Sequence, residues 1–245
     1  VGKAPKRPPL PSMKDPPRIY RHRVPARKPD NTEKPEEPKR LRPDVFREAK
    51  RLVEEEKLPE NRIAVPRTMD RYHPMVEMLS PRAEKKRRAI IKKWRDYTRR
   101  QKEAVEGLVR MRVGDEHFDR AARIMTVLIE ALESRGYVVE AEYQEYRGNR
   151  SFVTIMEQEV PFRLREPSKR REPTKEEKER YSRLRYVDEP SGYLEFELTE
   201  HISGGRRSKW RDTKTRRLED YLNDIIAAMI MDAAHQVEWQ AAVEQ

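Results

Sequence analysis

The sequence lacks cysteine and long apolar runs, and each absence excludes a class of protein. Without cysteine there is no disulfide scaffold and no cysteine-ligated zinc site. No run of about 18 apolar residues is present, so no membrane-spanning helix is expected. The basic, proline-rich start predicts no secretory signal, and we expect a cytoplasmic protein. With only 8 glycines, the sequence shows no P-loop or GxGxxG motif, and it also has no HExxH motif or nucleophile elbow.

Charge is abundant and unevenly placed. Charged residues make up 40% of the 245 residues, and the formal net charge is +11. Residues 1–43 carry a net charge of +8, residues 82–102 carry +9 and residues 205–217 carry +6. Together these three segments hold +23, so the rest of the chain holds −12. The distribution predicts an acidic body with three basic segments. It favours binding of an anionic partner at these basic segments.

The chain divides into three parts by composition. Residues 1–43 contain 11 of the 19 prolines and predict an extended, basic, proline-rich arm. Residues 44–106 predict a helical linker region with a long basic helix that begins at Ser80 and Pro81. Residues 107–245 show the apolar periodicity of a folded α+β domain.

The periodicity of residues 107–245 predicts a mainly antiparallel sheet with helices on one face, in an α+β sandwich. Before it, residues 45–57 and 70–79 predict short helices, and residues 62–65 a short strand. In the domain, Gly114 and Asp115 cap a helix that Gly136 ends, and Gly148-Asn149 is a predicted turn. Helical character returns at residues 174–184, with Thr174 and Glu177 as a capping box, and after residue 217. Strands are expected over residues 107–113, 137–146, 151–156, 159–165 and 192–202.

The basic helix is the first candidate nucleic-acid site. Like charges four residues apart, as at Arg88 and Lys92, destabilise a bare helix, so the pattern indicates an anionic partner rather than only a solvated face. The candidate phosphate contacts in this helix are Lys85, Lys86, Arg87, Arg88, Lys92, Lys93, Arg95, Arg99 and Arg100.

The third basic segment is the second candidate. Asp212 and Thr213 resemble the cap of the last helix, so the cations after them occupy its first turns, where a bound phosphate would meet free N–H groups. Trp210 could stack on a base, although packing against the body is the commoner role of such a residue. The candidate contacts in this segment are Arg206, Arg207, Lys209, Lys214, Arg216 and Arg217.

Signals for catalysis are weak. The five histidines are isolated and show no metal-ligand spacing. Glu195 and Glu197 lie on one face of a predicted strand and could hold Mg²⁺ for a nuclease, although a solvent-facing polar side of a sheet explains the same pattern. We therefore expect no catalytic residue, no metal and no cofactor, with a metal-dependent nuclease as an alternative.

Two short segments carry a resemblance to a known group of proteins. The stretches at residues 1–11 and at residues 210–224, which include Trp210-Arg211-Asp212 and Leu222-Asn223-Asp224, resemble those of uncharacterised bacterial proteins with an upstream helix-turn-helix module. The resemblance implies a DNA-associated protein whose helix-turn-helix lies before this chain, and it brings no catalytic residue with it.

The sequence thus predicts a nucleic-acid-binding, DNA-associated regulatory protein without catalysis, whose basic segments hold phosphates without reading sequence. The C-terminal domain would serve as a platform for dimerisation or for another protein chain, and no membrane contact is expected. An RNA-binding ribonucleoprotein component is an alternative, because proline-rich basic arms suit threading between RNA helices. A pure protein-interaction scaffold is a further alternative.

Overall fold

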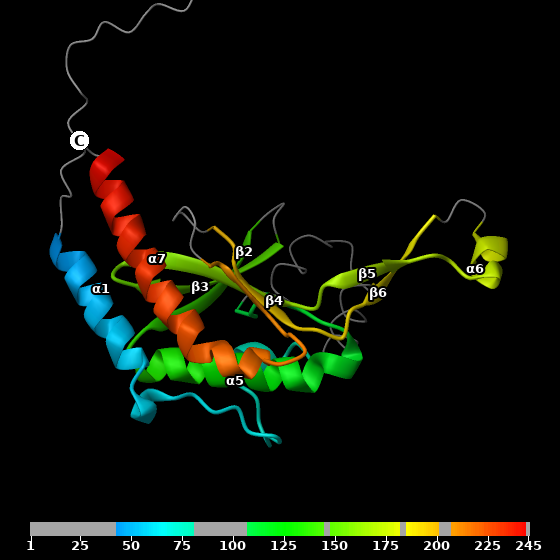
Figure 1. Ribbon diagram of the computed structural model, residues 1–245, viewed down its shortest axis with the longest axis horizontal. Coiled ribbons are helices and arrows are strands. Elements are labelled where there is room, and N and C mark those ends of the chain that lie inside the picture. Colours follow the sequence, from blue (N-terminus) through cyan, green and yellow to red (C-terminus); the bar gives the residue numbers. More distant parts are fainter. Residues whose placement is uncertain (1–42, 81–106, 145–147, 182–184, 201–206, 244–245) are drawn as a thin grey trace, which may run out of the picture. The chain divides into compact units, whose positions relative to one another are not determined.

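The computed structural model describes residues 43–80, 107–144, 148–181, 185–200 and 207–243 (Figure 1). The chain divides into two units, residues 1–37 and residues 38–245, and all described residues belong to the second. Residues 1–42 of the predicted arm and the predicted basic helix, with its nine candidate contacts, lie outside the described residues.

The centre of the fold is a six-stranded sheet, of which the sequence predicted five strands and missed the one at Lys209–Arg211. Five strands pair antiparallel in the order β2-β3-β4-β7-β8, and the short β1 pairs parallel with β4. The α+β class with a mainly antiparallel sheet is therefore confirmed. The strand bounds are β1 Met111–Arg112, β2 Val138–Gln144, β3 Gly148–Ile155, β4 Gln158–Arg165, β7 Glu195–Leu198 and β8 Lys209–Arg211.

Two long helices supply most of the helical part of the core. The helix α5 contacts β2, and α7 contacts β3 and β4 and also lies beside α1 (Figure 1). Among the described residues, no helix is long and apolar enough to cross a membrane. The helices are α1 Pro43–Glu56, α2 Pro74–Glu77, α5 Phe118–Ser134, α6 Lys175–Arg180 and α7 Leu222–Val243, with 3-10 turns η1 Pro59–Asn61, η2 Asp115–His117 and η3 Leu218–Tyr221.

The core lies between these helices and one face of the sheet. Phe162 on β4 and Phe196 on β7 stack with ring centroids 5.5 Å apart, and the buried Trp210 on β8 lies next to Phe196. Alternate residues on each strand face this core because successive side chains point to opposite sides of a strand. The other side chains of β4, β7 and β8 therefore form a second, charged face.

The segment before residue 81 packs onto the same body. Asn223 on α7 donates to the backbone oxygens of Glu56 and Asn61 and accepts from the N–H of Ile63. Glu56 also binds the Arg135 guanidinium at the end of α5. Ala49 of α1 and the α2 segment contribute to the shared core, so the described residues 43–80 are part of one hydrophobic unit with the sheet.

The structure differs from the sequence predictions at several turns. Residues 62–65 form no strand, and the predicted strand at 107–113 shortens to the two residues of β1. The predicted Gly148-Asn149 turn is wrong, because both residues belong to β3 and pair with β2. Residues 145–147, which join β2 to β3, lie outside the described residues. A separate tight turn joins β3 to β4, where Met156 and Glu157 have φ of 50° and 63°.

A two-stranded ribbon continues from the sheet. β5 (Ser168–Arg171) follows β4, β6 (Val187–Pro190) precedes β7, and the two pair antiparallel. The helix α6 follows β5 and begins at Thr174, whose side chain accepts from the N–H of Glu177 while the Glu177 carboxylate accepts from the N–H of Thr174. The predicted capping box at these two residues is confirmed.

Candidate nucleic-acid interface

The register of four strands places alternate charged residues in two rows on the charged face. Arg112 aligns with Arg165, Arg165 with Glu195, and Glu195 with Arg211, which gives the first row. In the second row, Arg163 aligns with Glu197, and Glu197 with Lys209. Arg110 belongs to this row as well, because it lies two residues before Arg112 on the chain. We call these eight residues the arginine rows: Arg110, Arg112, Arg163, Arg165, Glu195, Glu197, Lys209 and Arg211.

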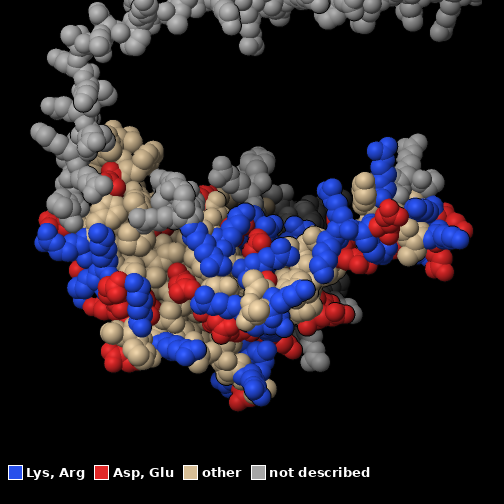
Figure 2. Space-filling model, viewed as in Figure 1, with Lys and Arg blue, Asp and Glu red and all other residues tan. Residues whose placement is uncertain are grey.

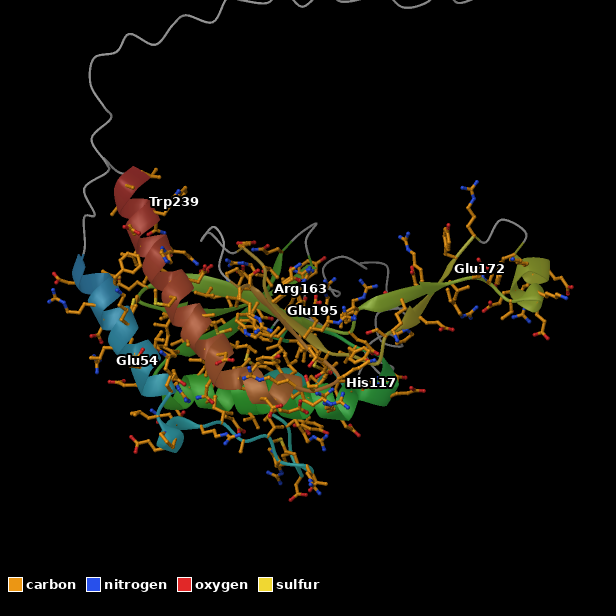
Figure 3. All side chains as sticks on the ribbon, in the orientation of Figure 1. Glu54, His117, Arg163, Glu172, Glu195 and Trp239 are labelled. Carbon is orange, nitrogen blue, oxygen red and sulfur yellow. The ribbon has the colours of Figure 1, made fainter. Side chains whose placement is uncertain are left out.

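The arginine rows carry six cations and two carboxylates, and the cations exceed the carboxylates on each row. In Figure 2, Lys and Arg side chains gather over the sheet with Asp and Glu between them, and Figure 3 labels Arg163 and Glu195 there. Strands are about 4.8 Å apart and alternate residues on one strand about 6.7 Å apart, so this grid is dense in positive charge.

The two glutamates of the rows are held by neighbouring cations. Glu197 lies 2.5 Å from Arg163 and 2.9 Å from Lys209, and Glu195 lies 2.6 Å from Arg165. Burial raises the pKa of Glu197, but the hydrogen bonds from Lys209 and Arg163 outweigh this, so that pKa lies below its ordinary value. Both glutamate side chains are about nine-tenths buried beneath the cations.

This arrangement bears on the alternative of a magnesium site at Glu195 and Glu197. Their oxygens already accept from arginine and lysine, which compete with a metal for the same lone pairs. Among the described residues, no group of three or more histidine, aspartate or glutamate side chains could hold a metal ion.

Three cations of the rows have no carboxylate partner among the described residues: Arg110, Arg112 and Arg211. Arg110 is half-buried and lies near Arg163, and its pKa is lowered by burial and by the charge of that arginine. Arg112 is exposed, and Arg211 lies over the ring of Tyr193. Glu197 and Glu200 act on Arg110 by charge without an ion pair, and a bound anion would add negative charge directly beside these three cations.

One end of the charged face is electrically balanced. Arg150 on β3 lies 2.5 Å from Glu159, 3.3 Å from Glu142 and 3.6 Å from Glu200. Its guanidinium also lies 4.9 Å from the centre of the Phe152 ring. Because Arg150 is surrounded by carboxylates, this end of the charged face carries no excess of positive charge.

The sequence predicted that the third basic segment occupies the first turns of the last helix, and the structure contradicts this prediction. The 3-10 turn η3 begins at Leu218, after the candidate cations Lys214, Arg216 and Arg217. The N–H groups of Arg216, Arg217 and Leu218 donate to Thr213, Asp220 and Asp212 respectively. These donors are used inside the protein, so the predicted meeting of a phosphate with free N–H groups there is wrong.

Asp212 instead holds the fold together. Its carboxylate, which is 0% exposed, accepts from the N–H of Leu194 and Leu218 at 2.8 Å and from Arg120 at 2.6 Å. Burial raises the pKa of Asp212, but these hydrogen bonds outweigh burial and hold it below its ordinary value. Arg120 also binds Glu219 of η3.

Aromatic rings engage two cations of the third segment. Arg207 and Arg216 lie 4.6 Å and 3.8 Å from the centre of the Tyr221 ring. Trp210 is 2% exposed, so its ring packs in the core and is not available to stack on a base. Lys214 and Arg217 are exposed, and Lys209 belongs to the arginine rows. Arg206 lies outside the described residues.

Sequence reasoning missed Arg110, Arg112, Arg163, Arg165 and Arg211. Each belongs to a pair of cations separated by one residue, namely 110 and 112, 163 and 165, or 209 and 211. On a strand this spacing places both cations on one face. The signal was present, but a search for dense runs of lysine and arginine does not detect it.

Comparison of the chain with protein-family models, with curated proteins and with solved structures gives no match. The class of protein is therefore defined by its fold alone, an α+β body with a cation-rich sheet face, and its function is argued from the geometry of that face.

Proposed function

We propose that this protein is a non-catalytic nucleic-acid-binding protein that holds the phosphate backbone on the arginine rows. The observation that carries the proposal is the excess of six cations over two glutamates on four neighbouring strands. DNA is the proposed target and regulation its proposed context, in a cytoplasmic setting. The resemblance to proteins with an upstream helix-turn-helix stays a prediction.

Phosphate binding suits this surface for two physical reasons. Arginine presents a planar fork of donors that matches phosphate oxygens, and five of the six cations are arginines. Nucleic acid releases condensed counterions when cations replace them, which favours binding to a dense array of positive charge. Arg110, Arg112 and Arg211 are the cations with the most to gain, because no described carboxylate pairs with them.

The test is a titration of the full chain with duplex DNA and with structured RNA over a range of salt concentrations. We compare the wild type with the double variant Arg110→Gln, Arg112→Gln, which keeps side-chain length and removes two charges. If both residues contact phosphates, the log–log salt slope falls in magnitude by about 1.8 in the variant.

A matched control separates a local contact from net charge. Arg47→Gln with Arg67→Gln removes the same two charges from exposed positions outside the arginine rows. We expect this control to keep the wild-type slope. An equal loss in both double variants would contradict the proposed surface. Tighter binding to structured RNA than to duplex DNA would favour the ribonucleoprotein alternative, and binding to neither would contradict the function.

A further inference from the structure

The ribbon of β5 and β6 has no core of its own. Lys169 and Arg170 of β5 and Asp188 and Glu189 of β6 are exposed. Figure 1 shows the two strands running away from β4. An isolated two-stranded ribbon is only marginally stable in water. Its persistence here must therefore come from contacts within the ribbon and at its base.

Ion pairs brace the ribbon internally. The guanidinium of Arg171 binds the carboxylate of Glu177 on α6 with two hydrogen bonds of 2.7 Å, and it also binds Glu189 on β6. The same Glu177 closes the capping box of α6 at Thr174. Arg171 thus links β5, β6 and α6.

The base of the ribbon is fixed to the body. Glu166, whose side chain is 2% exposed, accepts from the N–H of Gly114 at 3.0 Å and of Gly192 at 2.8 Å. His117 at the start of α5 lies 3.4 Å from the same carboxylate and is labelled in Figure 3. The N–H of Ser191 donates to the oxygen of Pro167. These contacts fix the direction in which the ribbon leaves the sheet.

One aromatic ring joins the ribbon to the arginine rows. The ring of Tyr193 has Lys169 of the ribbon 5.5 Å from its centre and Arg211 of the first row 5.6 Å from its centre. The ring of Tyr193 therefore lies between a cation of the ribbon and a cation of the first row. A phosphate backbone lying on the rows would bring the adjoining part of the nucleic acid to the ribbon.

We infer that the ribbon enters the major groove of B-form duplex DNA while the arginine rows hold the neighbouring backbone. This inference rests on the proposed function and names its ligand more closely. The major groove is about 12 Å wide and admits a two-stranded ribbon, whereas the major groove of A-form RNA is too narrow for side-chain access.

Lys169 is the ribbon cation that faces the bases. It lies over the Tyr193 ring on the ribbon face that adjoins the arginine rows, whereas Arg170 and Asp188, which pair with each other one position further along, point to the opposite face. Lysine donates to guanine O6 and N7, so Lys169 matches a guanine in the major groove.

The experiment combines affinity with chemical protection. The full chain is bound to duplex DNA, and dimethyl sulfate methylation of guanine N7, an atom in the major groove, is mapped. Affinity is also measured for a duplex RNA of the same length and sequence. The wild type is expected to protect N7 and to bind the DNA at least about tenfold more tightly than the RNA.

Two double variants separate the inference from the proposed function. Lys169→Gln with Arg170→Gln is expected to lose N7 protection and the preference for DNA over RNA while keeping salt-dependent binding. Arg110→Gln with Arg112→Gln is expected to weaken binding to both duplexes. Wild-type binding with N7 fully reactive, or unchanged protection in the ribbon variant, overturns the inference and leaves the proposed function standing. Absence of wild-type binding overturns both.

Discussion

Arg120 and Arg110 carry the same charge on the same body, but their surroundings are opposite. Arg120 lies between the carboxylates of Asp212 and Glu219, and its hydrogen bonds to Asp212 raise its pKa. Arg110 is half-buried without a described carboxylate partner and next to Arg163, and its pKa is lowered. The comparison teaches that one arginine completes the fold, whereas the other is held without an ion pair to a described carboxylate, as the proposed phosphate contact requires.

The strongest test of this contrast is removal of the Asp212 charge. Asp212→Asn takes the charged acceptor from Arg120 and from two backbone N–H groups, and breaking one side of a buried pair costs about 3–5 kcal/mol. We expect a loss of about 3 kcal/mol in the free energy of unfolding, measured by urea denaturation. Asp224→Asn, at an exposed contact of Arg216, is the control and should change little.

The same carboxylate predicts a dependence on pH. Because the folded-state pKa of Asp212 lies below its ordinary value of 3.8, its contribution to stability is present above that value and is lost as the pH falls through the folded-state pKa. The stability difference between wild type and Asp212→Asn should therefore be constant near neutral pH and shrink below about pH 4. A difference that grows in acid would contradict the assignment.

A smaller effect is expected at Glu197, which holds cations of the arginine rows. Glu197→Gln removes a carboxylate that holds Arg163 and Lys209, and it should cost about 1–2 kcal/mol of stability. The same change leaves the arginine rows with one more net positive charge. Duplex DNA should then bind more tightly at low salt, and weaker binding in a salt titration would argue against the surface.

The smallest effect on stability is expected at Arg110 and Arg112. Arg110→Gln with Arg112→Gln removes no ion pair to a described carboxylate, and it relieves repulsion between Arg110 and Arg163. We expect a change below about 1 kcal/mol in the free energy of unfolding, together with the loss of salt slope described above. A large destabilisation would show that Arg110 and Arg112, like Arg120, stabilise the fold.

Capping residues and helix-ending glycines in the sequence predicted where several helices of this structure begin and end. Thr174 and Glu177 cap α6 as expected, and Gly136, with φ of 81°, ends α5 as expected. The β3–β4 turn was not predictable in this way, because Met156 and Glu157 take left-handed conformations that glycine and asparagine normally signal. Its position follows from pairing of the strands on either side.

The candidate site was less predictable than the fold. Asp212 was read as a helix cap because it precedes a helix, but its two backbone partners, Leu194 and Leu218, come from different elements that only tertiary structure brings together. The arginine rows depend on register across four strands, and register is a long-range property. Cations at alternate positions indicate that they share one face of their own strand. They do not indicate which strands are its neighbours in the sheet.

The parallel pairing of β1 with β4 has a consequence for the order of folding. β2, β3 and β4 follow one another through short connections, whereas Met111 must meet Leu164, which lies 53 positions further along the chain. Distant pairings close more slowly than local ones because more chain entropy is lost before contacts form. β1 is therefore expected to dock after the meander has assembled, so Arg110 and Arg112 join the other cations only on a finished sheet. An incomplete chain emerging from the ribosome would therefore lack the assembled surface on which the proposed binding depends.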